Sequence, residues 1–375
     1  MNERYLKIFH MADFHLDSPF AGLDLKASDE RRASLRMAFS SALSRAVSDG
    51  CNLVLIAGDL FDCGYVTAET VEKTFKAIGK CPLPVVISPG NHDPFVSGGV
   101  YSKKDLPENL YVFSSEKLER IDLDTIGVSV HGYAFTGDRL DESPVSKENI
   151  SLHPKNVNLL LAHADLYAPF SKYAPLSPRT LESSGFVYAA LGHVHKRTPP
   201  ESFGRCLAAY SGFPEGRGFD ELGYGGALEV TVDRETLTAD TERVILSLRR
   251  YEWEKLDCSG MTNPSDAEAA IRKLIRDKGF GVGLALRVTL FGAVSPEFTP
   301  PTSLSGELLG LELFELINET SPVFDAAYLE NDVSLRGALY RELLPALRSD
   351  DPEKRRVAAK ALHIGLAALD GRPFM

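Results

Sequence analysis

The feature that most constrains this chain is a series of five short polar blocks, each placed directly after an apolar segment of strand length. The blocks read Asp-Phe-His at 13–15, Gly-Asp-Leu-Phe-Asp at 58–62, Gly-Asn-His-Asp at 90–93, His-Ala at 163–164 and Gly-His-Val-His at 192–195. Continuous apolar runs, such as residues 53–57, are typical of strands that are buried on both faces in layered α/β proteins. Because ligands in such folds bind beyond the carboxyl ends of the strands, we expect the five blocks to meet at one edge.

Helices are predicted between the first strands. In residues 28–49 an apolar stripe of Leu35, Phe39 and Leu43 recurs with helical spacing, and Gly50 follows it as a typical helix end. A second helix is expected around residues 68–78, and the strands at 6–11, 53–57, 84–87, 157–162 and 187–191. This alternation predicts an α/β fold for the first half of the chain.

The length of 375 residues exceeds what one core usually organises and predicts two or three domains. A new unit opens at Tyr251, with a capping box at 265–268, a helix to Lys278 and a strand at 284–291. Prolines between 296 and 301 predict a linker, and helical patterns follow at 335–347 and 352–369. We therefore expect domains at 1–250 and 251–295 and a helical region at 304–375.

Composition restricts the location and the partners of the protein. Phosphate neutralisation dominates DNA affinity, so a chain with a net charge of −11 is expected to bind DNA weakly alone and to need a partner. The apolar runs are far shorter than the roughly 20 residues that span a bilayer, and no signal-peptide core precedes the first strand. The five scattered cysteines form no C-x-x-C pair. These features predict a cytoplasmic protein with free thiols and no membrane association.

The side chains in the five blocks are those of a two-metal hydrolytic centre. Such a centre needs hard oxygen and imidazole ligands around two cations about 3.5–4 Å apart. Each block alone has a plain structural explanation: Asp59 as a turn or helix cap, His163 as a buried core histidine, and residues 91–93 as a tight turn. Their joint occurrence, each after a predicted strand, favours the metal centre.

The series D-x-H, G-D-x-x-D, G-N-H-D, H and G-H-x-H resembles that of the calcineurin-like metallophosphoesterases. The longer strings at 10–20, 58–62 and 190–196 resemble the DNA-repair exonuclease SbcD family, and the segments at 16–20 and 212–221 are most similar to its YhaO-like branch. This resemblance implies a four-layer α-β-β-α sandwich, followed by a small α/β capping domain and a helical C-terminal tail.

The resemblance also implies a role for individual residues. Seven side chains would hold two divalent cations, with Mn²⁺ expected. The first cation would be bound by Asp13, His15 and His195. The second would be bound by Asn91, His163 and His193, and Asp59 would bridge both. A metal-bridging hydroxide would then attack phosphorus in line.

Three further residues are expected to be catalytic. His92 would stabilise developing charge or protonate the leaving oxygen, and Asp93 would orient its imidazole. The role of Asp62 is open, because related nucleases have histidine at the matching position. Arg217, in a Gly-rich loop, would contact either a substrate phosphate or a carboxylate of the protein.

Together these observations predict a metal-dependent phosphodiester hydrolase that acts on DNA, as an exonuclease or endonuclease subunit of an SbcCD-like repair complex. The resemblance implies an SMC-like ATPase partner (SbcC/YhaN-like), docked on the helical tail, and a homodimer. A metallophosphoesterase acting on a small-molecule or protein phosphoester is the alternative, because the chemistry of the metal centre is shared.

Overall fold

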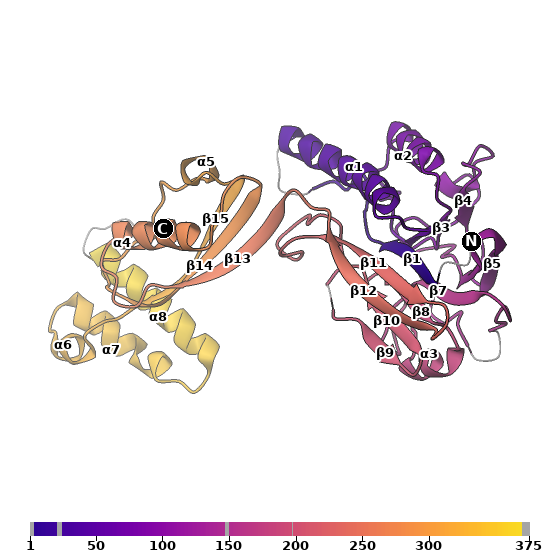
Figure 1. Cartoon of the computed structure of the whole chain (residues 1–375). Helices are drawn as coiled ribbons and strands as arrows, with labels where there is room; N and C mark the ends of the chain where they lie inside the picture. Colours follow the sequence, from indigo (N-terminus) through magenta and orange to yellow (C-terminus); the bar gives the residue numbers. More distant parts are fainter. Residues whose placement is uncertain (1–3, 21–24, 147–149, 197, 370–375) are drawn as a thin grey trace. The chain divides into compact units, whose positions relative to one another are not determined.

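The computed structural model describes residues 4–20, 25–146, 150–196 and 198–369, which form two compact units. The first unit is Met1–Arg250 and the second is Tyr251–Met375 (Figure 1). Each unit has hydrophobic clusters of its own, so each is described separately.

The first unit contains two six-stranded sheets. One sheet has the order β12 (Thr238–Ile245), β11 (Gly226–Asp233), β1 (Tyr5–Met11), β2 (Leu53–Ile56), β3 (Val85–Ile87) and β4 (Leu110–Val112). The other has the order β5 (Glu119–Leu123), β6 (Val128–Gly132), β7 (Val157–His163), β8 (Tyr188–Gly192), β10 (Cys206–Tyr210) and β9 (Glu201–Phe203). Strands β1 to β4 are parallel, and so are β6, β7, β8 and β10, so the carboxyl ends within each set share one edge.

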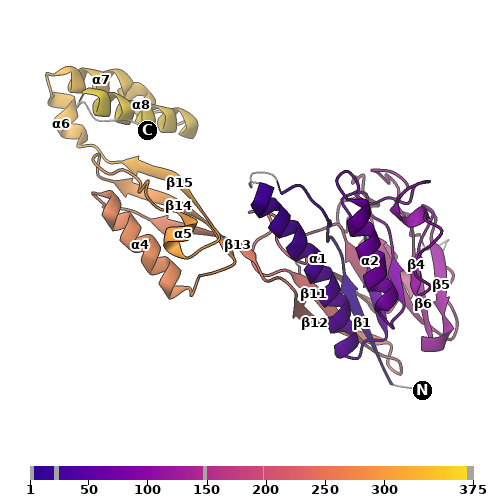
Figure 2. The same ribbon diagram turned by 90° about the horizontal axis from the view of Figure 1, so that it is seen from above.

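The layers follow from the alternation of side chains along the strands. On β1, Phe9 packs with Leu35 of α1 (Leu25–Ser48), whereas Ile8 packs between the two sheets with Leu159. Helices α1 and α2 (Ala68–Lys80) lie together on the outer face of the first sheet (Figure 2). The short α3 (Pro178–Ser184) packs on the outer face of the second sheet through Leu181. The predicted α-β-β-α sandwich is therefore confirmed.

The second unit contains a three-stranded sheet, β13 (Arg250–Asp257), β14 (Leu284–Val294) and β15 (Leu313–Pro322). Helix α4 (Pro264–Asp277) covers one face through Ile271 and Ile275, and α5 (Gly306–Leu309) precedes β15. Strand β15 pairs with β14 along its whole length, so this α/β part extends to residue 322 and not to 295. The second half of β15, residues 318–322, has no apolar side chain that alternates, and the strand is only partly buried, which is why its pattern did not indicate a strand. The helix cap also differs from the predicted capping box at 265–268, because the N-cap is Asn263, whose side chain accepts the Asp266 amide.

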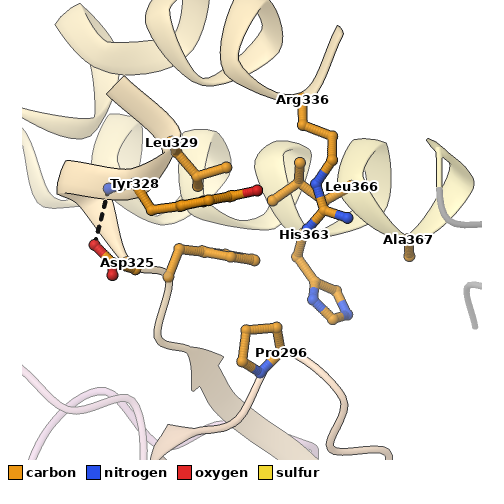
Figure 3. A pocket seen from close by; sticks show the side chains of 9 residues that line it. Pro296, Asp325, Tyr328, Leu329, Arg336, His363, Leu366 and Ala367 are labelled. Carbon is orange, nitrogen blue, oxygen red and sulfur yellow. Dashed lines mark hydrogen bonds between the residues drawn. The ribbon is translucent and has the colours of Figure 1, made fainter. Parts of the chain in front are cut away.

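The C-terminal helices follow this sheet, so the helical region begins at residue 326 rather than 304. They are α6 (Ala326–Asn331), α7 (Leu335–Leu347) and α8 (Pro352–Leu369), and residues 370–375 lie outside the described residues. A pocket of about 180 Å³, lined by Tyr328, Arg336 and His363, lies among them (Figure 3). Among the described helices, none is both long and apolar enough to cross a membrane.

Candidate metal centre

The five polar blocks meet where β1, β2, β3, β7 and β8 end. The Asp13 amide donates to the Gly58 carbonyl at 3.1 Å, and the His15 amide donates to the Asp59 carbonyl at 2.9 Å. Gly192 and Gly90 allow the ends of β8 and β3 to lie equally close to the end of β2. A Cβ atom on Gly192 would overlap the Ala57 carbonyl, and one on Gly90 would overlap the Asp59 carboxylate. The glycines of these blocks are therefore required by packing around the site.

Four of the candidate ligands have a left-handed backbone, which side chains other than glycine rarely adopt. The φ angles are 55° at Asp13, 43° at His15, 50° at Asp59 and 93° at His193. Each such residue costs about 1–3 kcal/mol and persists only where the surrounding structure holds it. Strained positions of this kind concentrate at functional sites, which agrees with a site at this edge of the sheets.

The first group of donors consists of Asp13, His15 and His195, whose ligand atoms lie within 4.8 Å of one another. His195 Nε2 is 3.2 Å from His15 Nε2 and 3.7 Å from Asp13 Oδ1. Atoms that share a cation at about 2.1 Å lie roughly 3.0–3.4 Å apart, and the separation of His15 Nε2 and His195 Nε2 falls in this range.

The tautomer of His195 supports the same conclusion. Its Nδ1 is 2.7 Å from Glu221 Oε1, so this nitrogen carries the proton and donates to the carboxylate. The Nε2 lone pair of His195 is then directed at His15 Nε2. Two imidazole nitrogens facing one another at 3.2 Å fit a cation between them, and a carboxylate behind the ring is the usual support of a metal-binding histidine.

The second group consists of Asp13, Asp59 and His163, with Asn91 beside them. His163 Nδ1 lies 2.9 Å from the Ala57 carbonyl and donates to it, so Nε2 is the nitrogen that a cation would bind. That Nε2 is 3.0 Å from Asn91 Oδ1 and 3.4 Å from Asp59 Oδ2. Because Asp59 Oδ2 is also 3.5 Å from His15 Nε2, its carboxylate lies between the two groups, where a bridging ligand is needed.

His193 lies at the edge of the second group. Its ring is 5.1 Å from the His163 ring, while its Nε2 is 3.6 Å from Asp165 Oδ2. The Tyr173 ring covers it at a centroid distance of 4.6 Å. Asp165 and Tyr173 were not among the predicted site residues, because they come from the loop after β7 and match no motif.

The buried charges of the site set its protonation. Burial raises the pKa of Asp13 to about 6. Burial opposes ionisation of Asp59 as well, but the neighbouring His163 outweighs it and lowers the pKa of Asp59. Burial lowers the pKa of His163, but the Asp59 carboxylate outweighs burial and raises the pKa of His163 to about 9. A proton on His163 thus offsets the Asp59 charge, and a bound cation would have to displace it.

His92 lies beside the first group with its side chain 49% exposed. Its ring meets the His15 ring edge-on at 4.8 Å, and its Nδ1 is 3.9 Å from Asp62 Oδ1. Asp62 is the main cause of the raised pKa of His92 and outweighs partial burial of the ring. The structure therefore places Asp62, whose role was open, as a charged neighbour of His92, at a separation longer than a hydrogen bond.

Asp93 does not orient His92, so that part of the sequence interpretation is wrong. Its fully buried carboxylate accepts backbone amides from Asp59 at 3.1 Å, Leu60 at 2.7 Å, Phe61 at 3.2 Å and Gly90 at 2.8 Å. The Tyr101 hydroxyl donates to it as well, at 2.5 Å. These bonds hold the loops that carry Asp59 and Asn91, which makes Asp93 a positioning residue of the metal centre.

Arg217 contacts a carboxylate of the protein, the second of its two predicted alternatives. Its Nη2 is 2.6 Å from Glu221 Oε1, and its Nη1 donates to Ser18 at 3.2 Å. Sequence reasoning missed Glu221, which lies in the Gly-rich loop between β10 and β11. Only the folding of that loop back toward β8 brings its carboxylate to His195.

This layered fold, with acidic, amide and imidazole donors gathered at the strand ends, is that of a dinuclear phosphoesterase. Residues 6–197, just over half of the chain, match the calcineurin-like phosphoesterase family. The chain therefore belongs to this family, whose members bind a dinuclear metal centre, and the predicted family is confirmed.

Individual relatives include the metallophosphoesterase YhaO of Bacillus subtilis, 28% identical over 67% of this chain and 62% of that protein. The DNA double-strand break repair protein Mre11 of Aeropyrum pernix is 30% identical over 50% of this chain and 49% of its own length. A subunit of the nuclease SbcCD of Staphylococcus epidermidis is 25% identical over 66% of this chain and 71% of its own length. The chain thus spans less than two thirds of the first two relatives.

Proposed function

We propose that this protein is a nuclease that hydrolyses phosphodiester bonds of DNA with two divalent cations, Mn²⁺ being the expected metal. The observation that carries the proposal is the pair of donor groups joined by Asp59, with the half-exposed His92 next to them. A bridging carboxylate can hold two cations side by side, and a proton donor speeds departure of the leaving oxygen.

The residues fit two cations. Asp13, His15 and His195 would hold one, Asn91, His163 and His193 the other, and Asp59 would bridge them. When bound, two such cations activate water and neutralise charge that develops on the phosphate. Neutral amide and imidazole donors keep the site from becoming strongly anionic, so that it accepts a phosphodiester.

The chain itself handles the proton. Asp62 favours the charged form of His92, so a larger share of the protein molecules has a protonated His92 near neutral pH. His92 is exposed enough to reach a bound ester and donates this proton to the leaving oxygen. Asp93 keeps Asp59 and Asn91 in place through the amides of their loops.

DNA is the proposed substrate because two relatives are named as a DNA repair protein and a nuclease subunit. The net charge of −11 argues that the chain borrows its hold on DNA from a partner in the cytoplasm. We propose that this partner is an SMC-like ATPase bound to the region of helices α6 to α8, where Val333 and Leu335 are exposed. A homodimer is part of the same proposal.

Digestion of end-labelled DNA tests this function. The full chain with Mn²⁺ is incubated with linear duplex and single-stranded DNA, and with bis-p-nitrophenyl phosphate in parallel. We expect wild type to cleave both the DNA and the small ester. His92→Ala should keep two metals but lose about 10²–10⁴-fold in rate. Ester hydrolysis without DNA cleavage, also after addition of the ATPase, would favour a small-molecule or protein phosphoester.

A further inference from the structure

The loop between β7 and α3, residues 164–177, presents aromatic side chains next to the candidate metal centre and is called the aromatic loop here. At its apex Phe170 is 97% exposed and Tyr167 is 60% exposed, and Lys172 is exposed beside them. We propose that this apex stacks against unpaired nucleobases of the DNA strand bound at the metal centre. The inference rests on the proposed nuclease function and names its substrate class, DNA with unpaired bases next to the scissile phosphate.

The base of the aromatic loop is held firmly. Leu166 and Leu176 are buried in the core of the second sheet and pair with each other. The Asp165 amide donates to the Tyr173 carbonyl at 3.0 Å, and the Ala174 amide donates to the Leu140 carbonyl at 2.7 Å. The apex is therefore carried on an ordered base. Ordering of the loop on binding should cost little of the binding free energy.

Tyr167 is also fixed in place although it is exposed. Its hydroxyl donates to Glu201, and its ring lies 6.4 Å from the Phe203 ring. Its φ angle of 80° is a conformation that a residue with a side chain keeps only when neighbours hold it there. These contacts hold the exposed ring of Tyr167 in one position, whereas most exposed side chains move freely.

The aromatic loop is near enough to act on a bound strand. Its Tyr173 covers the His193 ring at 4.6 Å, and its Asp165 lies 3.6 Å from His193 Nε2. Phe170 is three residues from Tyr173, and three residues reach at most about 11 Å. The apex is therefore within reach of nucleotides that flank a phosphate held at the centre.

Charge favours bases as the ligand over phosphates alone. The sequence of the aromatic loop contains a single basic residue, Lys172, and the loop contacts two acidic side chains, Asp165 within it and Glu201 beside it. A weak electrostatic hold on phosphate leaves stacking as the main attraction. Every base has a π-face, so stacking on Phe170 and Tyr167 suits a nuclease that does not select a sequence.

Binding and cleavage by Phe170→Ala in the full chain test the proposal. The probes are a labelled single-stranded oligonucleotide, a forked duplex with 2-aminopurine in its unpaired end, and a blunt duplex. We expect roughly 5- to 150-fold weaker binding of the two unpaired probes, loss of 2-aminopurine quenching, and a small effect on the blunt duplex. Phe170→Trp should restore binding. Hydrolysis of bis-p-nitrophenyl phosphate should be unchanged.

Tyr5→Ala serves as the matched control, because Tyr5 is an exposed aromatic residue at the opposite end of β1 from Asp13. Equal affinity of wild type and Phe170→Ala for the unpaired probes overturns the inference and leaves the nuclease function intact. If wild type hydrolyses the ester but neither binds nor cleaves DNA, also after addition of the ATPase, the nuclease function itself fails. Loss of ATPase binding by Phe170→Ala with DNA binding unchanged would make the apex a protein contact and also refute the proposal.

Discussion

Glu221 offers the sharpest test of how the candidate centre is supported. Its carboxylate is almost fully buried and lies 2.7 Å from His195 Nδ1 and 2.6 Å from Arg217 Nη2. Burial opposes its ionisation, yet His195 and Arg217 lower the pKa of Glu221 to about 2, so it is charged at neutral pH. Glu221→Gln removes this charge while it keeps the size of the side chain and an oxygen that accepts from Nδ1.

The expected effect is on metal binding. Loss of a carboxylate behind a metal-binding histidine weakens binding by about 10- to 100-fold, which corresponds to about 1.4–2.7 kcal/mol. Only one cation is expected to be affected, because Glu221 supports His195 of the first group. The charged partner of Arg217 is also lost, so the variant should unfold at a lower temperature.

Titration calorimetry with Mn²⁺ measures both affinities, and ester hydrolysis as a function of Mn²⁺ concentration measures the consequence. The rate at saturating Mn²⁺ should stay within a few-fold of wild type. Glu215→Gln is the matched control, since Glu215 is equally buried in the same loop but accepts from the Leu248 amide at 3.2 Å. Unchanged affinities in Glu221→Gln, or equal weakening in both variants, would refute the reasoning.

Three more outcomes are expected from the site and the second unit. Asp59→Ala should lose both cations, because the carboxylate lies between the two groups; two metals per chain by elemental analysis would contradict the bridging role. Metal-free His163 holds its proton up to its pKa of about 9, so Mn²⁺ affinity should rise by up to about tenfold per pH unit below that value and then level off. An affinity independent of pH between 6 and 8 would exclude this competition. Ending the chain after Pro322 removes α6 to α8 but keeps β15, so ester hydrolysis should survive while co-purification with the ATPase is lost; retained co-purification would place the partner elsewhere.

Local patterns in the sequence predicted the strands of the first unit that carry the donor residues, and the helices α1 and α2. The run at 53–57 was recognisable as a buried strand because both of its faces are apolar, and it packs against α1 on one side and the second sheet on the other. The donor residues were found because each follows such a strand, and parallel strands end at a common edge. The ends of α7 and α8 were also predicted, since their periodicity is continuous.

The second unit shows where local pattern fails. Residues 313–322 have no clear apolar alternation, and they form a strand because β14 offers a partner along its whole length. Pairing of this kind depends on a segment about 28 residues away, as in Ala285 with Leu313. An edge strand without apolar alternation is specified by its neighbour more than by its own residues.

By itself the sequence determined the class of the protein and the kinds of donor at its centre, because these depend on residue type and on short spacings. The tertiary structure alone decided how the donors are supported. Asp93 serves the amides of two loops and not His92, Asp62 faces His92, and Glu221 reaches His195 from another strand connection. Such contacts join residues far apart in the chain, and the direction of a buried carboxylate is settled by the unpaired donors around it.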